Sequence, residues 1–212
     1  MNTFDSRPGF HWRSSGLSDA HTFLLPSIRT LLSETPSLSQ PSKLFDLGCG
    51  NGSTMAYFSD LGWDVCGVDP SDSGYQLCRD KYPSLNVAKM SAYDNLSEHF
   101  GQFPLVLSLE VVEHLYDPRS YANTLFSLVQ PGGYAILSTP YHSYFKNLIL
   151  ALSGKMDDHF TVLWDHGHIK FWSVKTLSFL LSQAGFYVER IERVGRFPAL
   201  AKSMIFLVRR RI

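Results

Sequence analysis

Short apolar runs alternate with amphipathic stretches along this sequence. Four of these runs are almost wholly apolar over four or five residues, which is typical of strands covered by helices on both faces. They are Leu44–Leu47, Val65–Val68, Leu105–Leu109 and Tyr134–Leu137. No internal repeat or low-complexity block interrupts the alternation. The pattern predicts an α/β domain built on a doubly wound, mostly parallel sheet with helices on both faces.

Two of the helices can be placed by their start signals. Asp117 can cap a helix that carries Pro118 at its first position, and Ser173 can cap a later one. In both cases an apolar stripe with helical spacing follows the cap. Pro131-Gly132-Gly133 is expected to end the first helix, and Gly185 the second.

The end of the chain predicts a pair of strands. Phe186–Ile191 and Met204–Val208 are apolar runs with few residues between them, so we expect a hairpin and one antiparallel edge. At 212 residues the chain has room for one such domain. We divide it into a helical N-terminal cap (1–40), a cofactor-binding core (41–140), an insertion (141–170) and the C-terminal helix with its strand pair (171–212).

The insertion is long for an ordinary connection and contains many aromatic, His and Asp residues. Its apolar residues recur at helical spacing, and this pattern has two interpretations. One is a helix packed on the core. The other, which we favour, is an apolar lid over a hydrophobic acceptor, without the peripheral membrane contact that such a helix also permits. The stripe consists of Tyr144, Phe145, Leu148, Ile149 and Leu152.

Composition narrows the class of protein. Hydrophobic residues make up 44% and charged residues 18%, so the chain can bury a sizeable core. The 19 basic and 19 acidic residues balance, which disfavours nucleic acid as a partner. Three cysteines form no metal-type or disulfide pattern, and no secretory leader or membrane-spanning stretch is evident. We therefore expect a cytoplasmic protein; its oligomeric state stays open.

A glycine-rich turn follows the first predicted strand. Gly48, Gly50 and Gly52 leave room for a ligand against the backbone, at the strand end where doubly wound folds bind ligands. The GxGxG spacing differs from the dinucleotide fingerprint, and no Lys-Ser/Thr pair follows as in a P-loop. Asp46 precedes the turn and would repel a phosphate but attract a cation. A plain structural turn is the alternative.

Asp69 ends the second predicted strand. A carboxylate there can accept hydrogen bonds from both hydroxyls of a ribose. The alternative is that it caps the following helix, ahead of Pro70. We favour ribose binding because the acid and the glycine turn lie on neighbouring strands.

These motifs resemble those of class I S-adenosylmethionine-dependent methyltransferases. The residues that carry the resemblance are Asp46-x-Gly48-x-Gly50-x-Gly52, Asp69, Leu107–Leu115 (LSLEVVEHL) and Pro131-Gly132-Gly133. Two further stretches resemble motifs of a narrower branch of this family, the one that includes the ubiquinone-biosynthesis O-methyltransferases. They are Ser138-Thr139-Pro140 and His168–Ser173. From about Leu44 onward, the resemblance implies seven strands in the order 3-2-1-4-5-7-6.

The resemblance also implies roles for single residues. The glycines would pass the methionine part of S-adenosyl-L-methionine, Asp46 would reach its ammonium group, and Glu110 would face the same part. The backbone amide of Ser91 would contact the adenine in place of an acidic side chain. The implied cofactor-binding residues are Asp46, Gly48, Cys49, Gly50, Gly52, Asp69, Pro70, Ser91, Ala92, Glu110 and Val111.

Several histidines are candidates for a general base. His142 directly follows the fifth predicted strand, and we name it with His168 as the catalytic candidates, while His114 is expected to pack. Asp157, Asp158, His159 and the 165–168 stretch match no known metal spacing, so we expect no metal. Trp12 and Phe23 either close the pocket or pack in the core.

The function that we predict is methyl transfer to a small, mainly apolar acceptor, most simply to oxygen. Two alternatives stay open. One is a protein of the same fold that binds the cofactor without catalysis. The other is an aminopropyl transferase, which the apolar insertion fits poorly because a polyamine substrate calls for an acidic pocket.

Overall fold

The computed structural model describes residues 11–160, 163–164 and 166–212. Seven strands form one sheet in the order β3-β2-β1-β4-β5-β7-β6. This is the order that the resemblance implied. The strands are β1 (Lys43–Leu47), β2 (Asp64–Val68), β3 (Asn86–Ala88), β4 (Phe103–Leu109), β5 (Val129–Pro140), β6 (Phe186–Val194) and β7 (Ser203–Arg210).

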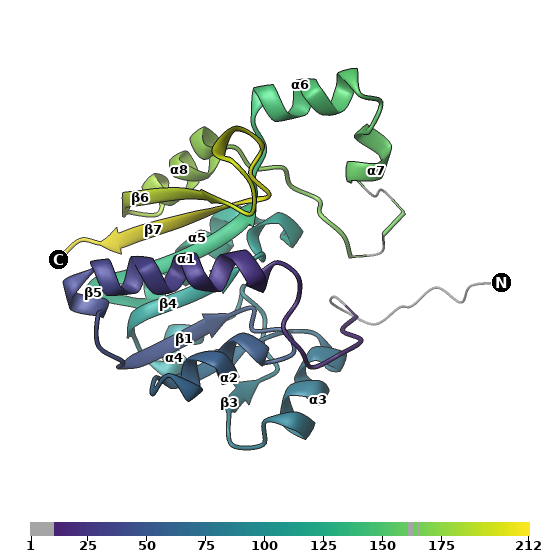
Figure 1. The fold of residues 1–212 in the computed structure, drawn as a ribbon. Coiled ribbons are helices and arrows are strands. Elements are labelled where there is room, and N and C mark those ends of the chain that lie inside the picture. Colours follow the sequence, from purple (N-terminus) through teal and green to yellow (C-terminus); the bar gives the residue numbers. More distant parts are fainter. Residues whose placement is uncertain (1–10, 161–162, 165) are drawn as a thin grey trace.

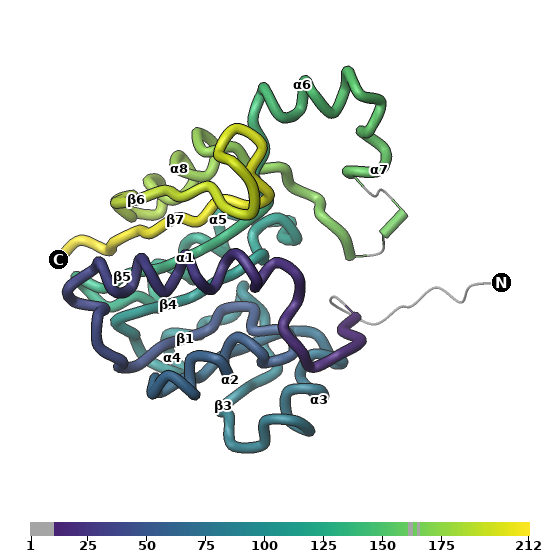
Figure 2. The backbone as a smooth tube through the Cα atoms, viewed as in Figure 1, coloured from purple at the N-terminus to yellow at the C-terminus, as the bar shows by residue number. Residues whose placement is uncertain are grey.

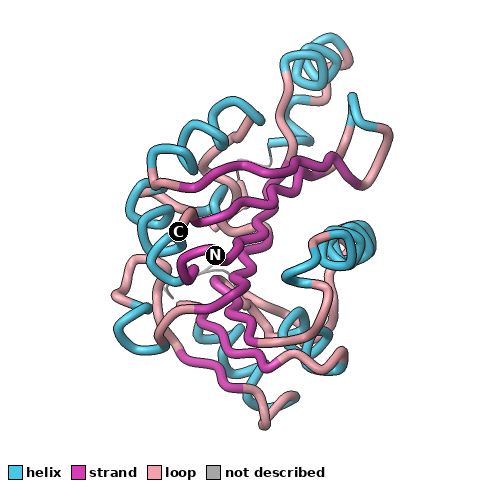
Figure 3. The backbone as a smooth tube through the Cα atoms, turned by 90° about the vertical axis from the view of Figure 1, so that its left-hand side faces the viewer, coloured by secondary structure: helices cyan, strands magenta, loops and turns pink. Residues whose placement is uncertain are grey.

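The first five strands are parallel, and β7 runs antiparallel to both of its neighbours. Helices cover both faces, as Figure 3 shows with the sheet seen from its edge. The described helices are α1 (His21–Glu34), α2 (Ser53–Asp60), α3 (Asp72–Lys81), α4 (Leu96–Phe100), α5 (Pro118–Leu128), α6 (Tyr144–Leu152), α7 (Met156–Phe160) and α8 (Val174–Gln183). The predicted fold class is therefore confirmed.

Two apolar cores lie on the two faces of the sheet. One joins the sheet to α4, α5 and α8, and Tyr121 and Leu177 are fully buried in it. The other joins it to α1, α2 and α3, with Ile28 and Phe58 fully buried. Complete burial of such side chains contributes about 1.5–3 kcal/mol each. The predicted caps are also present, since Asp117 accepts the N–H groups of Arg119 and Ser120, and Ser173 forms a capping box with Thr176.

Pro131-Gly132-Gly133 does not end α5, contrary to the prediction. The helix ends at Leu128, and Val129 already pairs with Phe103 of β4. The next pair is Leu105 with Tyr134, so the Pro-Gly-Gly stretch lies in a bulge inside β5. A bulge suits it because Pro131 has no N–H to contribute to the ladder.

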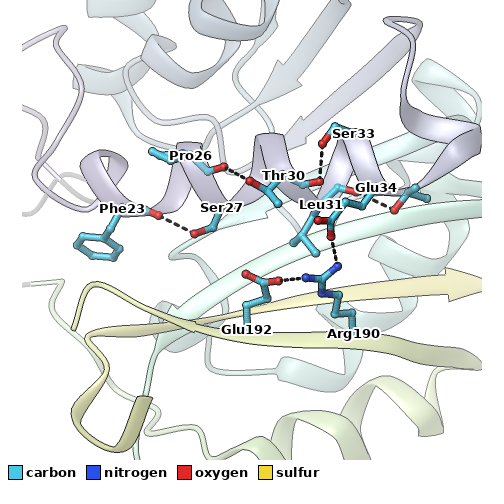
Figure 4. A network of polar contacts seen from close by, with 10 residues as sticks. Phe23, Pro26, Ser27, Thr30, Leu31, Ser33, Glu34, Arg190 and Glu192 are labelled. Atoms are coloured by element: carbon cyan, nitrogen blue, oxygen red, sulfur yellow. Dashed lines mark hydrogen bonds and ion pairs between the residues drawn. The ribbon is translucent and has the colours of Figure 1, made fainter. Parts of the chain in front are cut away.

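Helix α1 spans the sheet face and is held at both ends. Near its C-terminal end Glu34 pairs with Arg190 of β6, which also contacts Glu192 at 2.7 Å (Figure 4). Its first residue, His21, contacts Thr54 of α2. Residues 11–20 lead into α1 along α2 and α3 (Figure 2). The N-terminal part of the chain thus forms one wall of the site described below.

Helix α6 stands away from the sheet, and α7 follows it at the same end of the molecule (Figure 1). The only buried residue of α6 is Lys146, whose Nζ donates to the carbonyl oxygens of Tyr141 and Ala201. The apolar stripe is exposed, with 86% of Tyr144 and 80% of Leu152 accessible. The predicted helix is therefore present but does not pack on the core.

Candidate active site

A cavity of about 990 Å³ opens at the carboxyl ends of β1, β2 and β4. The sheet supplies its floor, and the N-terminal segment and the start of α1 contribute to one wall. Residues between α7 and α8 contribute to another. The floor residues include Asp46, Gly48, Asp69 and Glu110. Three motifs far apart in the sequence thus meet in one place because parallel strands end at the same edge.

The glycine turn is tied to the neighbouring strand. The N–H groups of Gly48 and Cys49 donate to the carbonyl of Val68, at 2.9 and 3.0 Å. Gly48 has a φ of +88°, which favours glycine, and a Cβ there would collide with the side chain of Val111. Gly48, Cys49 and Val111 all line the cavity, as the resemblance implies for cofactor-binding residues.

Gly50 and Gly52 are not among the described residues that line the cavity. The space that a Cβ would take at Gly50 is filled by the ring of Trp12, and at Gly52 by Cys78. Trp12 itself lines the cavity, whereas Phe23, a residue of α1, packs against the apolar core between α1 and the sheet. The second and third glycines therefore admit protein side chains, and only the first borders the open space.

Asp46 is buried, and one of its carboxylate oxygens lacks a hydrogen-bond partner among the described residues. It is 2% exposed, and its Oδ2 has no hydrogen-bond partner in the described part of the protein. Burial raises its pKa to about 7, and the charge of Asp69 adds to the increase. A cationic group in the cavity would supply the missing partner, which fits the ammonium end of S-adenosylmethionine.

Asp69 holds the turn together while facing the cavity. Its Oδ2 accepts the N–H of Gly50 and its Oδ1 accepts the N–H of Ser71, both at 2.8 Å. Burial raises its pKa, and these two bonds oppose the increase. The cap of α3 is Ser71, which accepts from Gly74, so capping does not explain Asp69. Each carboxylate oxygen keeps a second lone pair that can accept a ribose hydroxyl.

Glu110 lies in the left-handed backbone region, with φ at +55°. Its backbone N–H donates to the carbonyl of Ser138 at 3.1 Å. Its carboxylate accepts the hydroxyl of Ser138 at 2.8 Å and that of Ser203 at 3.4 Å. Burial raises its pKa to about 7, although both hydroxyls and the charge of Lys146 oppose the increase. This costly conformation on a non-glycine residue places a third acid, after Asp46 and Asp69, in the lining of the cavity.

Pro70, Ser91 and Ala92 line the cavity on the side where the adenine is expected. The Ser91 N–H, however, donates to the Oδ2 of Asp94 at 2.8 Å. A contact from this amide to the base would therefore have to replace or share the bond to Asp94, and it stays a prediction. Asp94, three residues after Ser91, is exposed and is not among the described residues that line the cavity.

Two histidines meet at the opposite wall. The rings of His114 and His168 lie 4.9 Å apart, and Trp164 contacts both. Burial is the main cause that lowers the pKa of each, to about 4 for His168. The Nδ1 of His114 faces the carbonyls of His166 and Gly167, which can only accept, so its proton is on Nδ1. Both imidazoles are uncharged at neutral pH.

His142 lies one layer behind this wall. It is 5% exposed and stacks on Phe160, with ring centroids 6.1 Å apart, and it contacts the edge of Phe171 at 5.1 Å. Both phenylalanines line the cavity, but His142 is not among the described lining residues. His168 is thus placed to meet a ligand directly, whereas His142 supports the wall.

Potential metal ligands also come together here. Glu113, His114 and His168 each offer a ligand atom, and these atoms lie within 4.8 Å of one another. Of the Asp and His residues at 157–168, only His168 belongs to this group among the described residues, and Asp165 lies outside them. Spacing could not reveal the actual group, because His168 is 54 residues away from His114 along the chain.

The polar residues of the wall near Trp12 were not predicted from the sequence, which suggested only Trp12 and Phe23 for that side of the pocket. Ser18, His21 and Thr54 line the cavity beside the glycine turn. Asn51 fixes this segment, because its Nδ2 donates to the carbonyls of Ser14 and Gly16 at 2.8 and 2.9 Å. No motif marks such residues, since their role depends on where the first helix begins.

The strand order, the glycine turn after β1 and the acid at the end of β2 together define the class I S-adenosylmethionine-dependent methyltransferase fold. A comparison with protein families matches residues 11–191 to the methyltransferase domain family. The chain therefore belongs to this family, and its cofactor is S-adenosylmethionine.

Similar proteins agree with this assignment. The ubiquinone biosynthesis O-methyltransferase of Hydrogenovibrio crunogenus is 24% identical over 206 residues, which cover 95% of this chain and 85% of that protein. An S-adenosylmethionine-dependent methyltransferase from Mesorhizobium loti has a TM-score of 0.64 at 17% identity, covering 87% of this chain and 96% of its own. Magnesium protoporphyrin IX methyltransferase from Synechocystis, with bound SAH, has a TM-score of 0.62 at 19% identity and coverages of 88% and 81%.

In the part of the chain that the structure describes, none of the helices combines the length and the apolar character needed to cross a membrane.

Proposed function

We propose that this methyltransferase methylates a hydroxyl oxygen on a small, mainly apolar acceptor. The observation that carries the proposal is the chemistry of the wall opposite the glycine turn. Phe160, Trp164, Ile169 and Phe171 supply apolar surface there. The histidines beside them are uncharged, and no Lys or Arg is among the described lining residues. Such a wall favours a neutral acceptor, and the names of the O-methyltransferase relatives support oxygen as the atom.

When bound, the cofactor would supply an electrophilic methyl group on a sulfonium, whose bond to sulfur breaks as the bond to the acceptor oxygen forms, with the sulfur leaving as a thioether. The chain mainly aligns the two reactants and excludes water. Asp46 and Glu110 hold the methionine end, and Asp69 holds the ribose. His168 accepts the proton that the acceptor hydroxyl releases. His114, oriented by two backbone carbonyls, packs against His168 and keeps its ring in place.

This proposal changes the role of the insertion. None of the stripe residues on α6 is among the described lining residues, whereas Phe160, Trp164, Ile169 and Phe171 are. The lid function that we predicted for the whole of 141–170 is therefore assigned to the later part of this segment. Helix α6 then serves as the support from which that part extends.

The test is an acceptor screen with labelled S-adenosylmethionine. Phenols, catechols and alcohols of increasing apolar size are compared with carboxylates and amines of the same size. We expect label transfer to neutral hydroxyl compounds and a rate that increases with apolar surface. Transfer to amines or carboxylates alone would contradict the proposal. Tight cofactor binding without transfer to any compound would favour the binding protein without catalysis.

A matched pair of variants assigns the base. His168→Gln removes the proton acceptor from the cavity, and His99→Gln changes an exposed histidine on α4, away from the lining. We expect the first variant to lose about 10²- to 10⁴-fold in rate and the second to keep its rate. Equal rates in both variants would remove His168 from the mechanism.

A further inference from the structure

The methionine end of the cofactor carries a carboxylate as well as an ammonium group. Within the described residues, the cavity is lined by the acids Asp46, Asp69 and Glu110 and by neither Lys nor Arg. The acids suit the ammonium group and the ribose hydroxyls, but they repel a carboxylate. The carboxylate must therefore be recognised by uncharged hydrogen-bond donors, and Ser18, His21 and Thr54 offer such groups in the wall beside the glycine turn.

A chain of hydrogen bonds in that wall fixes the direction of each proton. The backbone N–H of Ser18 donates to Nδ1 of His21 at 2.8 Å. Because an amide can only donate, this Nδ1 is unprotonated and the ring proton is on Nε2. Nε2 lies 2.9 Å from the hydroxyl oxygen of Thr54. The imidazole therefore donates, and Thr54 accepts.

The same geometry leaves the hydroxyl proton of Thr54 available. Its contact with His21 is the one side-chain hydrogen bond of Thr54 among the described residues. Thr54 is 6% exposed and lines the cavity, so a ligand is the natural acceptor for this proton. Thr54 is also the second residue of α2, an eight-residue helix, and a helix N-terminus favours a negative group.

His21 remains uncharged in this position. Burial lowers its pKa, and the bond from Ser18 opposes this only in part. As the first residue of α1 it also lies at a helix end that disfavours a positive charge. It can therefore act as a fixed donor to Thr54, independent of pH near neutrality.

We propose that the Thr54 hydroxyl, oriented by His21, binds the carboxylate of the cofactor's methionine moiety. Thr54 is the contacting residue and His21 a positioning residue. Together they make the site selective for S-adenosylmethionine over its decarboxylated form, which differs from it by this one group. The inference rests on the cofactor and is independent of the acceptor proposed above.

The experiment compares the dissociation constants of S-adenosylmethionine and decarboxylated S-adenosylmethionine, measured by calorimetry. We expect the natural protein to bind the carboxylated form at least about tenfold more tightly, the scale of one hydrogen bond to a charged group. Thr54→Val keeps the shape but removes the hydroxyl, and it should reduce this preference about fivefold or more. Thr54→Ser keeps the hydroxyl and should retain the preference.

His21→Phe tests the positioning role without touching Thr54. It removes the Nε2–H, and the preference should decrease while Thr54 remains. Thr30→Val, an exposed change on the same helix, is the control and should leave both affinities unchanged. An unchanged preference in Thr54→Val, or in His21→Phe should the first variant not fold, would overturn the inference. Failure of the natural protein to bind either form would instead contradict the cofactor assignment.

Discussion

Asp69 is the residue at which cofactor binding and the shape of the glycine turn can be separated experimentally. In Asp69→Ala the carboxylate is lost, so both ribose hydroxyls lose a charged acceptor. We expect the affinity for S-adenosylmethionine to decrease by roughly 2–4 kcal/mol, or about 30- to 700-fold. The change also leaves the N–H groups of Gly50 and Ser71 without their acceptor. The ligand-free protein should therefore lose about 1–3 kcal/mol of unfolding free energy.

A cofactor analogue distinguishes the two effects. The 2′-deoxy form of S-adenosylhomocysteine lacks one of the hydroxyls that Asp69 is expected to bind. The natural protein should bind it about tenfold more weakly than the parent compound, and Asp69→Ala should bind both forms equally. Asp72→Ala is the control. Asp72 is the first residue of α3, three residues after Asp69, and it forms a surface ion pair with Lys89.

The assay is calorimetry for the affinities and chemical unfolding of the ligand-free protein for the stability. Unchanged affinity in Asp69→Ala would refute the ribose role. The ribose role would also be refuted if Asp69→Ala and the natural protein showed the same loss of affinity between S-adenosylhomocysteine and its 2′-deoxy form. A loss of stability without a loss of affinity would leave Asp69 as a support of the turn only.

The remaining predictions concern the methionine end, the histidine wall and the aromatic wall. The pKa of Asp46 in the folded protein is about 7, above its value in the unfolded chain. The contribution of Asp46 to the stability of the ligand-free protein is therefore fully present below pH 4 and is lost as the pH rises through 7. Asp46→Asn should therefore raise ligand-free stability at pH 8 by up to about 4 kcal/mol and weaken cofactor binding, as measured by unfolding and calorimetry. His142→Ala should lower thermal stability while reducing the rate far less than His168→Gln does, because His142 supports the wall from behind; a larger rate loss in His142→Ala would reverse the two roles. Trp164→Ala should raise the KM for the acceptor about tenfold or more without changing the affinity for the cofactor. Leu148→Ser, on the exposed face of α6, should change neither quantity, and steady-state kinetics with an identified acceptor measures the difference.

Strands, caps and the cofactor loop were predictable because each depends on local sequence. The four apolar runs have the length and composition of buried strands, and Asp117 and Ser173 carry their own start signals. β3 was harder to predict, since its three residues show no periodicity, and only its place in the strand order followed from the resemblance. The bulge at Pro131–Gly133 was missed because the same residues also fit a helix end.

The site was less predictable than the fold for a physical reason. Motifs report residues that face a ligand through their own backbone, as Gly48 does, but they do not report residues brought in from elsewhere. His21 and Thr54 come together only when α1 docks, and His114 meets His168 only when residues 166–170 return to the sheet. That return depends on the Glu113 carbonyl, which accepts from both Ile169 and Lys170 at 2.9 Å. Nothing in the local sequence marks this anchor.

The position of β7 has a consequence for the order in which the molecule can assemble. This strand occupies residues 203–210, yet it lies between β5 and β6 and not at the rim of the sheet. Until it inserts, β5 lacks its second neighbour, and β6 has no partner strand in the described sheet. Its contacts span long stretches of chain, as between Ser138 and Ile205, and such pairings form slowly.

The same strand completes the site. Ser203 contacts Glu110, and Ala201, just before β7, accepts one of the two hydrogen bonds that anchor Lys146. During synthesis on the ribosome, a chain that has already formed β1 to β4 still lacks the Ser203 contact to Glu110, which we propose holds the methionine end of the cofactor, and α6 is not yet anchored. Catalytic competence is therefore acquired only when β7 has left the ribosome and inserted. Before that moment the open edges of β5 and β6 are the surfaces most exposed to misassembly.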